Sequence, residues 1–354
     1  MCKRILVSQT NTEDGVPFYK IGTIGSTPDA YISKELFDDY KVKYNYPRKG
    51  EVMITCAGTV GKCVVYDGED AYFQDSNIVW IDNPTQYISN GFLFHLLSKV
   101  DWRKLNSTTI IRIYNDDLRN LKMSYPRKEE QQKISHLLSL LDERIATQNK
   151  IIEDLKKLKS AIIEIEYSPK DSYHSHIGGA IVQISKRNKD NHLCNVLSVS
   201  NRQGFIKQSE QFEDRNVASD DTSNYKIVEK NDFAYNPARI NVGSIARLTK
   251  FETGIVSPMY ICFRTKDCLL PEYLELFFES RNFFYHIQKR LEGSVRLCLS
   301  YEELCNIPIV IPSIEKQKQV DLHLSKLAQK IDLEMKILQF VQQQKTYLLH
   351  QMFI

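Results

Sequence analysis

The sequence predicts an α+β protein made of two tandem mixed α/β domains, each followed by a long helix. We expect the two helices to pair as an antiparallel coiled coil, which relates the two halves by pseudo-twofold symmetry. Three observations carry this prediction: the chain repeats itself, each repeat ends in a heptad-patterned stretch, and strand-like segments precede each stretch. At 354 residues the chain also exceeds the usual size of one hydrophobic core, so two domains are expected.

The repeat is visible as matching residues at fixed offsets. At an offset of 186, Pro126 falls on Pro312 and Gln131 falls on Gln317. Further upstream the offset is 181, and Ser76 there falls on Ser257. The change in offset requires insertions totalling five residues between about 98 and 117. Two copies of one unit, about 180 residues each, therefore make up the chain.

The two copies predict four consecutive parts. Residues 1–125 and 168–311 are the two mixed domains, and 126–167 and 312–354 are the two long helices. Within the domains, β-branched and aromatic residues with Gly and Pro breaks predict short strands over 15–85 and 195–265. One helix is expected after each set of strands, over 91–103 and over 271–291.

The long helices carry a heptad seam, which is typical of coiled coils. Each stretch is about 40 residues, or roughly 60 Å of helix. Any single such helix could also be ordinary bundle core, but two matched helices after two matched domains favour pairing with each other. The residues expected to pair are Ile134, Leu138, Leu141, Ile145, Ile152, Leu155, Val320, Leu324, Leu327, Ile331, Leu338 and Val341.

The ends of the two copies differ. The second copy begins near Ser172, so the first lacks roughly ten N-terminal residues that the second has. We expect either a start further upstream or a trimmed, N-terminally short first domain.

Composition excludes several classes of protein. No apolar run is long enough to cross a bilayer, so a cytoplasmic protein is expected. The eight cysteines form no CxxC pair and have no His at finger-like spacing, which favours reduced core cysteines over a metal site. A net charge of +3 and a pI near 8.3 permit nucleic-acid binding without arguing for it.

Several segments resemble one known family. The stretch Pro126-Arg-Lys-Glu-Glu-Gln-Gln-Lys-Ile134 and its continuation are similar to the first conserved helix of the specificity (S) subunits of type I restriction–modification enzymes. Pro312-Ser-Ile-Glu-Lys-Gln317 is similar to the second. Gln74-Asp-Ser-Asn77 and Gly254-Ile-Val-Ser-Pro258 resemble parts of their target-recognition domains. The resemblance spans nearly the whole chain.

The resemblance implies a division of labour. Such a subunit reads a split, asymmetric target in double-stranded DNA, one half per domain, and carries two methyltransferase subunits and motor–nuclease subunits. The chemistry, which uses S-adenosylmethionine, ATP and Mg²⁺, belongs to those partners, so this chain is expected to hold no cofactor and no metal of its own.

The sequence itself contains no complete catalytic motif. Tyr235-Asn236-Pro237-Ala238 has half of an amino-methyltransferase motif, and no P-loop occurs. We therefore expect a chain that is not an enzyme by itself. A structural coiled-coil adaptor joining two protein-binding domains is the alternative reading, and a self-contained restriction enzyme is disfavoured by the missing motifs.

Base-edge readers are expected to be polar or basic side chains on loops beside glycine or proline breaks. Because the loops differ between the copies, two different half-sites and a non-palindromic target are expected, with centres about 10 bp apart. The DNA-binding candidates are Tyr19, Lys20, Thr23, Thr59, Lys62, Gln74, Asn77, Asn201, Arg202, Gln203, Asn236, Arg239 and Asn241.

Overall fold

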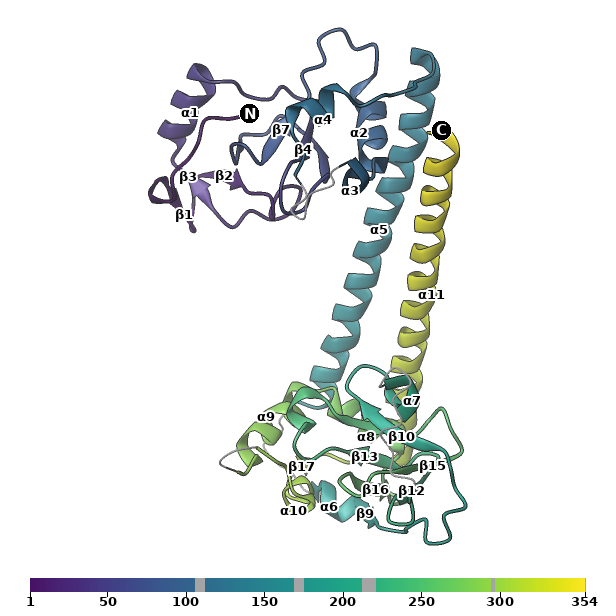
Figure 1. The fold of residues 1–354 in the computed structure, drawn as a ribbon. Helices are drawn as coiled ribbons and strands as arrows, with labels where there is room; N and C mark the ends of the chain where they lie inside the picture. Colours follow the sequence, from purple (N-terminus) through teal and green to yellow (C-terminus); the bar gives the residue numbers. More distant parts are fainter. Residues whose placement is uncertain (106–111, 169–174, 212–220, 294–296, 354) are drawn as a thin grey trace. The chain divides into compact units, whose positions relative to one another are not determined.

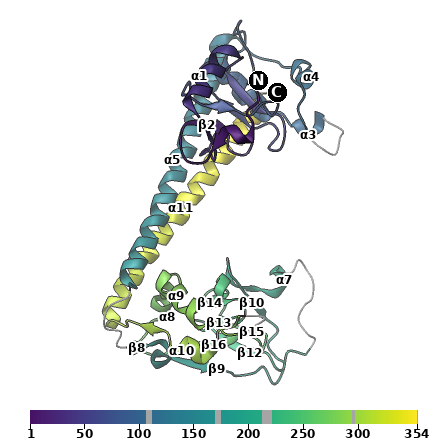
Figure 2. The same cartoon turned by 90° about the vertical axis from the view of Figure 1, so that its left-hand side faces the viewer.

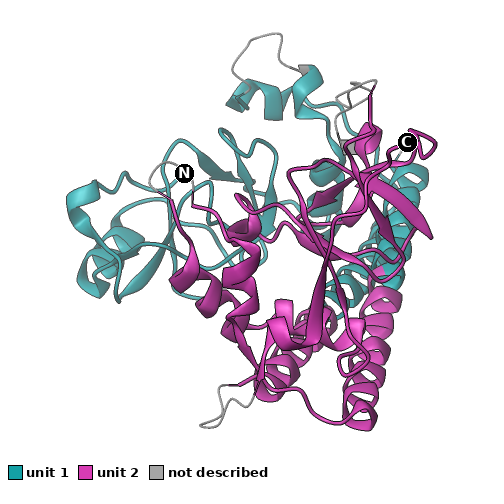
Figure 3. Ribbon diagram, turned by 90° about the horizontal axis from the view of Figure 1, so that it is seen from below, with its two compact units in different colours: residues 1–149, 336–354 teal, residues 150–335 magenta. Residues whose placement is uncertain are grey.

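The computed structural model describes residues 1–105, 112–168, 175–211, 221–293 and 297–353. The chain divides into two compact units (Figure 3). Unit 1 consists of residues 1–149 and 336–354, and unit 2 consists of residues 150–335. Each unit therefore contains one globular portion and a segment of both long helices.

The elements of unit 1 follow in chain order, and Figure 1 labels the main ones. They are η1 (Val7–Gln9), β1 (Thr10–Asn11), β2 (Val16–Tyr19), β3 (Tyr31–Ile32), α1 (Lys34–Lys43), β4 (Val52–Thr55), β5 (Cys63–Val65), β6 (Tyr72–Phe73), β7 (Ile78–Trp80), α2 (Asn90–Lys99), α3 (Trp102–Leu105), α4 (Asn115–Arg119), the first part of α5 (Lys128–Glu166) and the last part of α11 (Ile314–Met352).

Two small sheets form the globular portion of unit 1. One has the order β1-β3-β2-β6, in which β2 and β6 run parallel, and the other is the antiparallel sheet β5-β4-β7. Phe37 and Ile32 lie in the core of the first sheet, and neither residue has any solvent-accessible surface. The second sheet packs against α2, where Ile54 meets Phe92 and Leu97.

Unit 2 contains the remaining elements. They are the end of α5, β8 (Ser175–His176), α6 (Ile177–Ala180), β9 (Ile181–Ile184), β10 (Val196–Ser200), β11 (Gly204–Lys207), α7 (Gln208–Gln211), β12 (Lys226–Glu229), β13 (Phe233–Tyr235), η2 (Ile240–Val242), β14 (Ile245–Arg247), β15 (Thr253–Val256), β16 (Ile261–Thr265), α8 (Pro271–Phe278), α9 (Arg281–Arg290), α10 (Tyr301–Cys305), β17 (Pro308–Ile309) and the first part of α11 (Ile314–Met352).

Unit 2 repeats the architecture of unit 1. Its sheets have the orders β11-β10-β15-β12 and β14-β13-β16-β9, and a short pair β17-β8 adds to them. The central strands β10 and β15 run parallel, as β2 and β6 do. In Figure 2, β13 and β14 lie next to α8, and β10 and β15 lie farther from it. Strand β9 extends the second sheet of unit 2 beyond β16, whereas among the described residues the matching sheet of unit 1 stops at β7.

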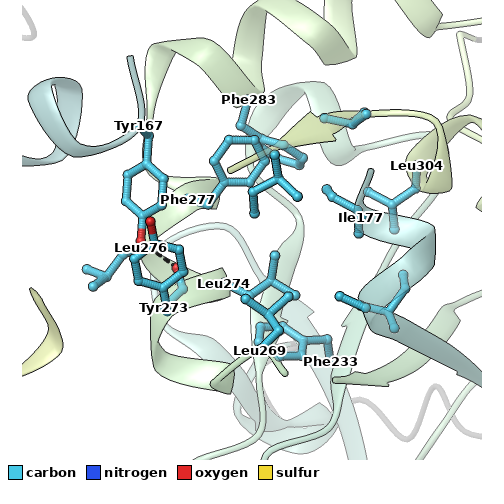
Figure 4. Packing of buried hydrophobic residues seen from close by; sticks show 14 of the residues in the cluster. Tyr167, Ile177, Phe233, Leu269, Tyr273, Leu274, Leu276, Phe277, Phe283 and Leu304 are labelled. Atoms are coloured by element: carbon cyan, nitrogen blue, oxygen red, sulfur yellow. Dashed lines mark hydrogen bonds between the residues drawn. The ribbon is translucent and has the colours of Figure 1, made fainter. Parts of the chain in front are cut away.

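The core of unit 2 joins its sheet to its helices. Tyr273 and Phe277 of α8 lie beside Tyr167, which follows α5, and the Tyr167 hydroxyl donates a 2.6 Å hydrogen bond to the Tyr273 carbonyl oxygen (Figure 4). In unit 1, Phe353 occupies the position that repeats Tyr167, and its ring lies 4.8 Å from that of Phe92, which repeats as Tyr273. The same aromatic contact therefore closes both units.

The two long helices pair antiparallel within each unit. In unit 1, Leu138 shares a core with Phe353, and Asp142, one turn later on α5, accepts a hydrogen bond from Lys345, which lies earlier on α11. In unit 2, Ile163 packs with Val320 and Leu324, and the Glu166 carboxylate lies 3.6 Å from the Lys316 ammonium. Both helices start just after their proline, with Glu129 and Glu315 in the first turn.

Two predicted helices are interrupted. The helix expected over 271–291 is divided into α8 and α9, because the Ser280 hydroxyl accepts a hydrogen bond from the Phe283 amide and caps a new helix. The helix expected over 91–103 ends at Lys99, and α3 begins at Trp102. Short capped turns thus replace continuous helix at both places.

The eight cysteines carry no disulfide. Cys2, Cys56 and Cys262 are buried, whereas Cys194 and Cys268 are exposed. Burial raises the pKa of the Cys2 thiol to about 11 and that of Cys262 to about 12, which keeps both protonated at neutral pH. In the described parts of the chain, no helix combines the length and apolarity that a bilayer crossing requires.

Candidate nucleic-acid interface

Three candidate segments of unit 1 converge, although two of the bonded residues, Ile21 and Gln74, are 53 positions apart in the sequence. The Thr59 hydroxyl donates a 2.9 Å hydrogen bond to the carbonyl oxygen of Ile21. The Ile21 amide in turn donates to the side-chain oxygen of Gln74 at 3.3 Å. The Lys62 ammonium donates to the carbonyl oxygen of Ile24. Loops 19–26, 56–62 and 74–77 therefore form one surface.

The 56–62 loop is shaped by two glycines and one threonine. Gly58 and Gly61 have φ values of +66° and +85°, a region that L side chains rarely adopt. Gly61 also lies directly against the indole of Trp102, where a Cβ would come within 2.2 Å of a ring carbon. The Thr55 hydroxyl, at the end of β4, donates to the Thr59 carbonyl oxygen and accepts a 3.0 Å hydrogen bond from the Lys62 amide. The loop is thus held closed at its base.

Arg112 is a basic residue of this surface that the sequence analysis missed. Its guanidinium donates a 3.2 Å hydrogen bond to the carbonyl oxygen of Ser76, which itself has a φ of +59°. The guanidinium carbon also lies 6.0 Å from the centre of the Tyr114 ring. Arg112 stands in the segment where the two copies change offset, so the internal alignment gave no signal there.

Unit 2 brings its two candidate segments together as well. The turn between β10 and β11 carries Asn201, Arg202 and Gln203, and the loop after β13 begins at Asn236. The Ser244 hydroxyl, at the end of that loop, donates to the carbonyl oxygen of Val199 at 3.2 Å. A Cβ on Gly243 would lie 3.8 Å from the Cβ of Asn201. The turn and the loop are therefore neighbours.

The candidates divide into side chains that shape the loops and side chains that the loops present. Asn236 is buried, and its side-chain oxygen accepts a 3.0 Å hydrogen bond from the Ala238 amide. The Thr23 hydroxyl similarly accepts from the Lys20 amide at 3.0 Å. Thr59, Lys62 and Gln74 hold the neighbouring loop, as described above. The exposed candidates of unit 2 are Asn201, Arg202, Gln203 and Arg239; Asn241 in unit 2 and Lys20 and Asn77 in unit 1 are half-buried.

Tyr19 and Lys20 have acidic neighbours. Tyr19 lines a cavity of about 110 Å³ that also contains Asp67 and Glu69. Burial raises the pKa of the Tyr19 hydroxyl, and these two carboxylates add to the shift. The Lys20 ammonium lies 3.0 Å from the Asp29 carboxylate. Nearby acids repel phosphate, so this side of the surface is less suited to DNA than the loops around Thr59.

Other arginines of unit 2 are held by carboxylates within the fold. Arg247 donates to Glu275 at 2.8 Å and also contacts Glu272. Arg264 donates to Asp232 at 2.6 Å and to Glu229 at 2.7 Å, and these hydrogen bonds raise its pKa further above the usual range. By contrast, no ion pair joins the guanidinium of Arg202 or of Arg239 to a residue that the structure describes. Both side chains are exposed.

The twelve residues expected in the helix pair are all at least half-buried. Leu138, Ile152, Val320, Leu324 and Ile331 are buried, and the other seven are intermediate. Four residues after the last member of each series lie the aligned polar residues Lys159 and Lys345. The Lys159 ammonium lies 2.7 Å from the Glu279 carboxylate in unit 2, and Lys345 contacts Asp142 in unit 1.

The described residues contain no group of three or more His, Cys, Asp or Glu side chains placed to hold a metal ion. The candidate interface thus consists of loops held in place by hydrogen bonds, together with polar side chains on them. Such groups are suited to hydrogen bonding with base edges and phosphates.

Residues 1–157 match the family described as the type I restriction modification DNA specificity domain. A putative type I restriction enzyme specificity subunit of Haemophilus influenzae is 50% identical over 155 residues, which are 44% of this chain and 40% of that protein. The chain thus matches about two fifths of the length of this curated relative. The resemblance seen in the sequence motifs is confirmed.

Solved structures show the fold over the whole chain. A type I restriction–modification S subunit from M. genitalium has a TM-score of 0.60 at 16% identity, covering 100% of this chain and 92% of that one. A chain from a structure titled for complex assembly and conformational transition of the type I R-M system has a TM-score of 0.53 at 15% identity, covering 97% and 92%. The predicted fold class, two mixed domains each followed by a long helix, is confirmed.

Proposed function

We propose that this chain, which carries a type I DNA specificity domain in residues 1–157, is the sequence-reading subunit of a type I restriction–modification system. In this proposal residues 1–125 and 168–311 are target-recognition domains that read the two halves of a bipartite, asymmetric DNA target. Residues 126–167 and 312–354 are the helices that join them. The observation that carries the proposal is the second unit, which repeats the construction of the first around different loops.

The reading surfaces support unlike half-sites. Unit 2 presents Arg202 and Arg239 without ion pairs to described residues, and arginine favours guanine in the major groove. In unit 1 the matching loops present Asn77 and the backbone around Thr59, with Arg112 alongside. Different donors and acceptors on one scaffold read different bases, so the target is not a palindrome.

The partners proposed from the resemblance are two methyltransferase subunits and the motor–nuclease subunits. A row on α5 supports a helical partner: Ile151, Leu158 and Ile165 recur every seven residues, outside the seam to α11, and are 36%, 50% and 74% exposed. Those partners, in this proposal, bind and use S-adenosylmethionine, ATP and Mg²⁺. This chain is not an enzyme by itself in the proposal.

Methylome sequencing tests the proposal. The full chain is expressed with the adenine methyltransferase subunit of its own system, and methylated adenines are mapped in the host DNA. The expected result is one bipartite motif with two unlike halves. Replacing the loops 200–204 and 236–244 should then change only one half. Methylation without a split motif, or a change in both halves, would contradict the proposed function.

A further inference from the structure

A buried glutamine stands at the start of each long helix. Gln131, on α5, is 1% exposed, and its side-chain amide joins three backbone groups of unit 1. Its oxygen accepts a 2.8 Å hydrogen bond from the Ser89 amide. Its nitrogen donates to the carbonyl oxygens of Tyr87 at 3.0 Å and of Pro126 at 2.9 Å.

The same three hydrogen bonds recur in unit 2. Gln317, on α11, is fully buried. Its side-chain oxygen accepts a 2.8 Å hydrogen bond from the Leu270 amide. Its nitrogen donates at 2.9 Å to the carbonyl oxygens of Cys268 and of Pro312. Tyr87 and Ser89 correspond to Cys268 and Leu270 at the offset of 181, and Pro126 corresponds to Pro312 at the offset of 186. The side chains of the first two pairs differ in type, so the backbone groups are what the two copies share. We call each set of three hydrogen bonds a glutamine clamp.

Each clamp holds the N-cap residue that precedes the domain's main helix. Ser89 is the N-cap of α2, and Leu270 is the N-cap of α8. The clamp therefore joins α2 to α5 in unit 1 and α8 to α11 in unit 2. The third hydrogen bond of each clamp goes to the proline just before the long helix. A side chain that uses its oxygen and both N–H groups has a single orientation, so the joint is directional in a way that apolar packing is not.

The clamped helix carries the strands that bear the reading loops. In unit 1, Phe92 and Leu97 of α2 pack on Ile54 of β4, and β4 leads directly into the 56–62 loop. In unit 2, Tyr273 and Phe277 of α8 pack in one core with Tyr235 of β13, which leads into the loop beginning at Asn236. A fixed series of contacts thus runs from glutamine to reading loop in both units.

We infer that Gln131 and Gln317 are positioning residues for DNA reading: each clamp sets the direction in which its recognition domain stands on the helix pair. The inference rests on the proposed function. Two half-sites are read together only when both domains present their loops at the spacing and rotation of the target. Loss of a clamp leaves the loops intact but lets the domain rock on its helix. The preference for one spacer length then weakens, while base preference within each half-site stays.

The test uses the full chain assembled with its methyltransferase subunits and the target found by methylome sequencing. Gln131→Leu and Gln317→Leu remove the clamps, and the exposed neighbours Gln132→Leu and Lys318→Leu are controls. Binding is measured on DNA with the native spacer and with spacers one base pair shorter or longer. Each clamp variant should reduce the preference for the native spacer about tenfold, comparable to the loss of roughly one net hydrogen bond.

A second pair of controls separates positioning from stability. Ile32→Ala and Val228→Ala weaken cores that contain no residue of α5 or α11. They should lower the unfolding temperature and leave the spacer preference unchanged. If Gln131→Leu does not fold, Gln131→Glu keeps the acceptor for Ser89 and loses the donors.

The outcomes are distinguishable. Relaxed spacer preference in both clamp variants, absent from all four controls, supports the inference. Clamp variants that only lose stability, with the spacer preference intact, overturn it alone. An unmodified complex without a bipartite target overturns the proposed function and this inference with it.

Discussion

At the scale of single residues, the loops separate structural from presented side chains by their hydrogen bonds. Arg239 is exposed at the loop after β13, and its guanidinium makes no ion pair with a described residue. Its backbone is nevertheless fixed, because the Arg239 carbonyl oxygen accepts hydrogen bonds from the Val242 and Ser244 amides. A fixed backbone with an available side chain is the arrangement that base reading requires.

Replacing Arg239 with alanine should therefore cost about 1–3 kcal/mol of binding at one base position of one half-site. Binding to a panel of single-base target variants measures this. The control is Arg187→Ala, an exposed arginine outside the reading loops. A loss of equal size on every sequence would instead identify Arg239 as a phosphate contact.

Gly61 is the residue on which the 56–62 loop depends most. It has a φ of +85°, and an added Cβ would come within 2.2 Å of the Trp102 ring. Gly61→Ala should lower the free energy of unfolding by about 1–3 kcal/mol, measured by chemical denaturation. Gly22→Ala is the matched control in the same surface, because nothing lies within 4 Å of its added Cβ. Equal effects at the two glycines would refute this explanation.

At the scale of elements, α2 carries a buried histidine at a position where its counterpart α8 carries leucine. His95 of α2 is 2% exposed and repeats as Leu276 in α8. Burial lowers the pKa of His95, and the nearby Asp142 carboxylate only partly opposes the shift. The unfolded chain therefore binds this proton more readily than the folded chain, so the folded state loses stability as pH falls below about 6.5.

His95→Leu, the residue of the second copy, should remove this acid sensitivity. Thermal unfolding at pH 7.5 and at pH 5 measures it: the decrease in unfolding temperature on acidification should be smaller in the variant. His136→Leu, at an exposed histidine of α5, should leave the pH dependence as it is. An undiminished decrease in His95→Leu would show that other groups titrate instead.

The exposed apolar row on α5 predicts a partner-specific defect. Leu158→Glu with Ile165→Glu should leave the helical content unchanged, because both side chains are at least half-exposed. Copurification of the methyltransferase subunit should decrease by about tenfold or more, since burying a charge in an apolar contact is unfavourable. Lys156→Glu, at an exposed polar position of the same helix, should have no such effect. Copurification at the level of the unchanged chain would remove α5 as the docking element.

At the scale of the whole molecule, we propose that the length of the helix pair sets the spacing between the two half-sites of the target. One heptad inserted after Asn149 in α5, with another after Met335 in α11, keeps the antiparallel seam in register. Seven residues lengthen each helix by about 10 Å, close to three base pairs of DNA. The permitted spacer should lengthen by about three base pairs, as read from the methylome. An unchanged spacer would show that the length of the helix pair does not set the spacing.

The sequence by itself determined the duplication, the two long helices and the resemblance to a known family. These follow from periodic apolar side chains and from matching residues at fixed offsets, and both are local or translational patterns that a linear chain displays directly. The sequence did not reveal that loops 19–26, 56–62 and 74–77 of unit 1 lie together, although it did name candidate residues within each loop.

Only the tertiary structure decided which candidates shape the loops and which face outward. Thr59, Lys62 and Asn236 are polar, as Arg239 is. The first three, however, use their side chains in hydrogen bonds within the protein. Arg112 and the two glutamine clamps likewise depend on contacts between distant segments. A hydrogen bond depends on where its partner lies in space, and folding alone brings donors and acceptors of distant segments within 3 Å of each other.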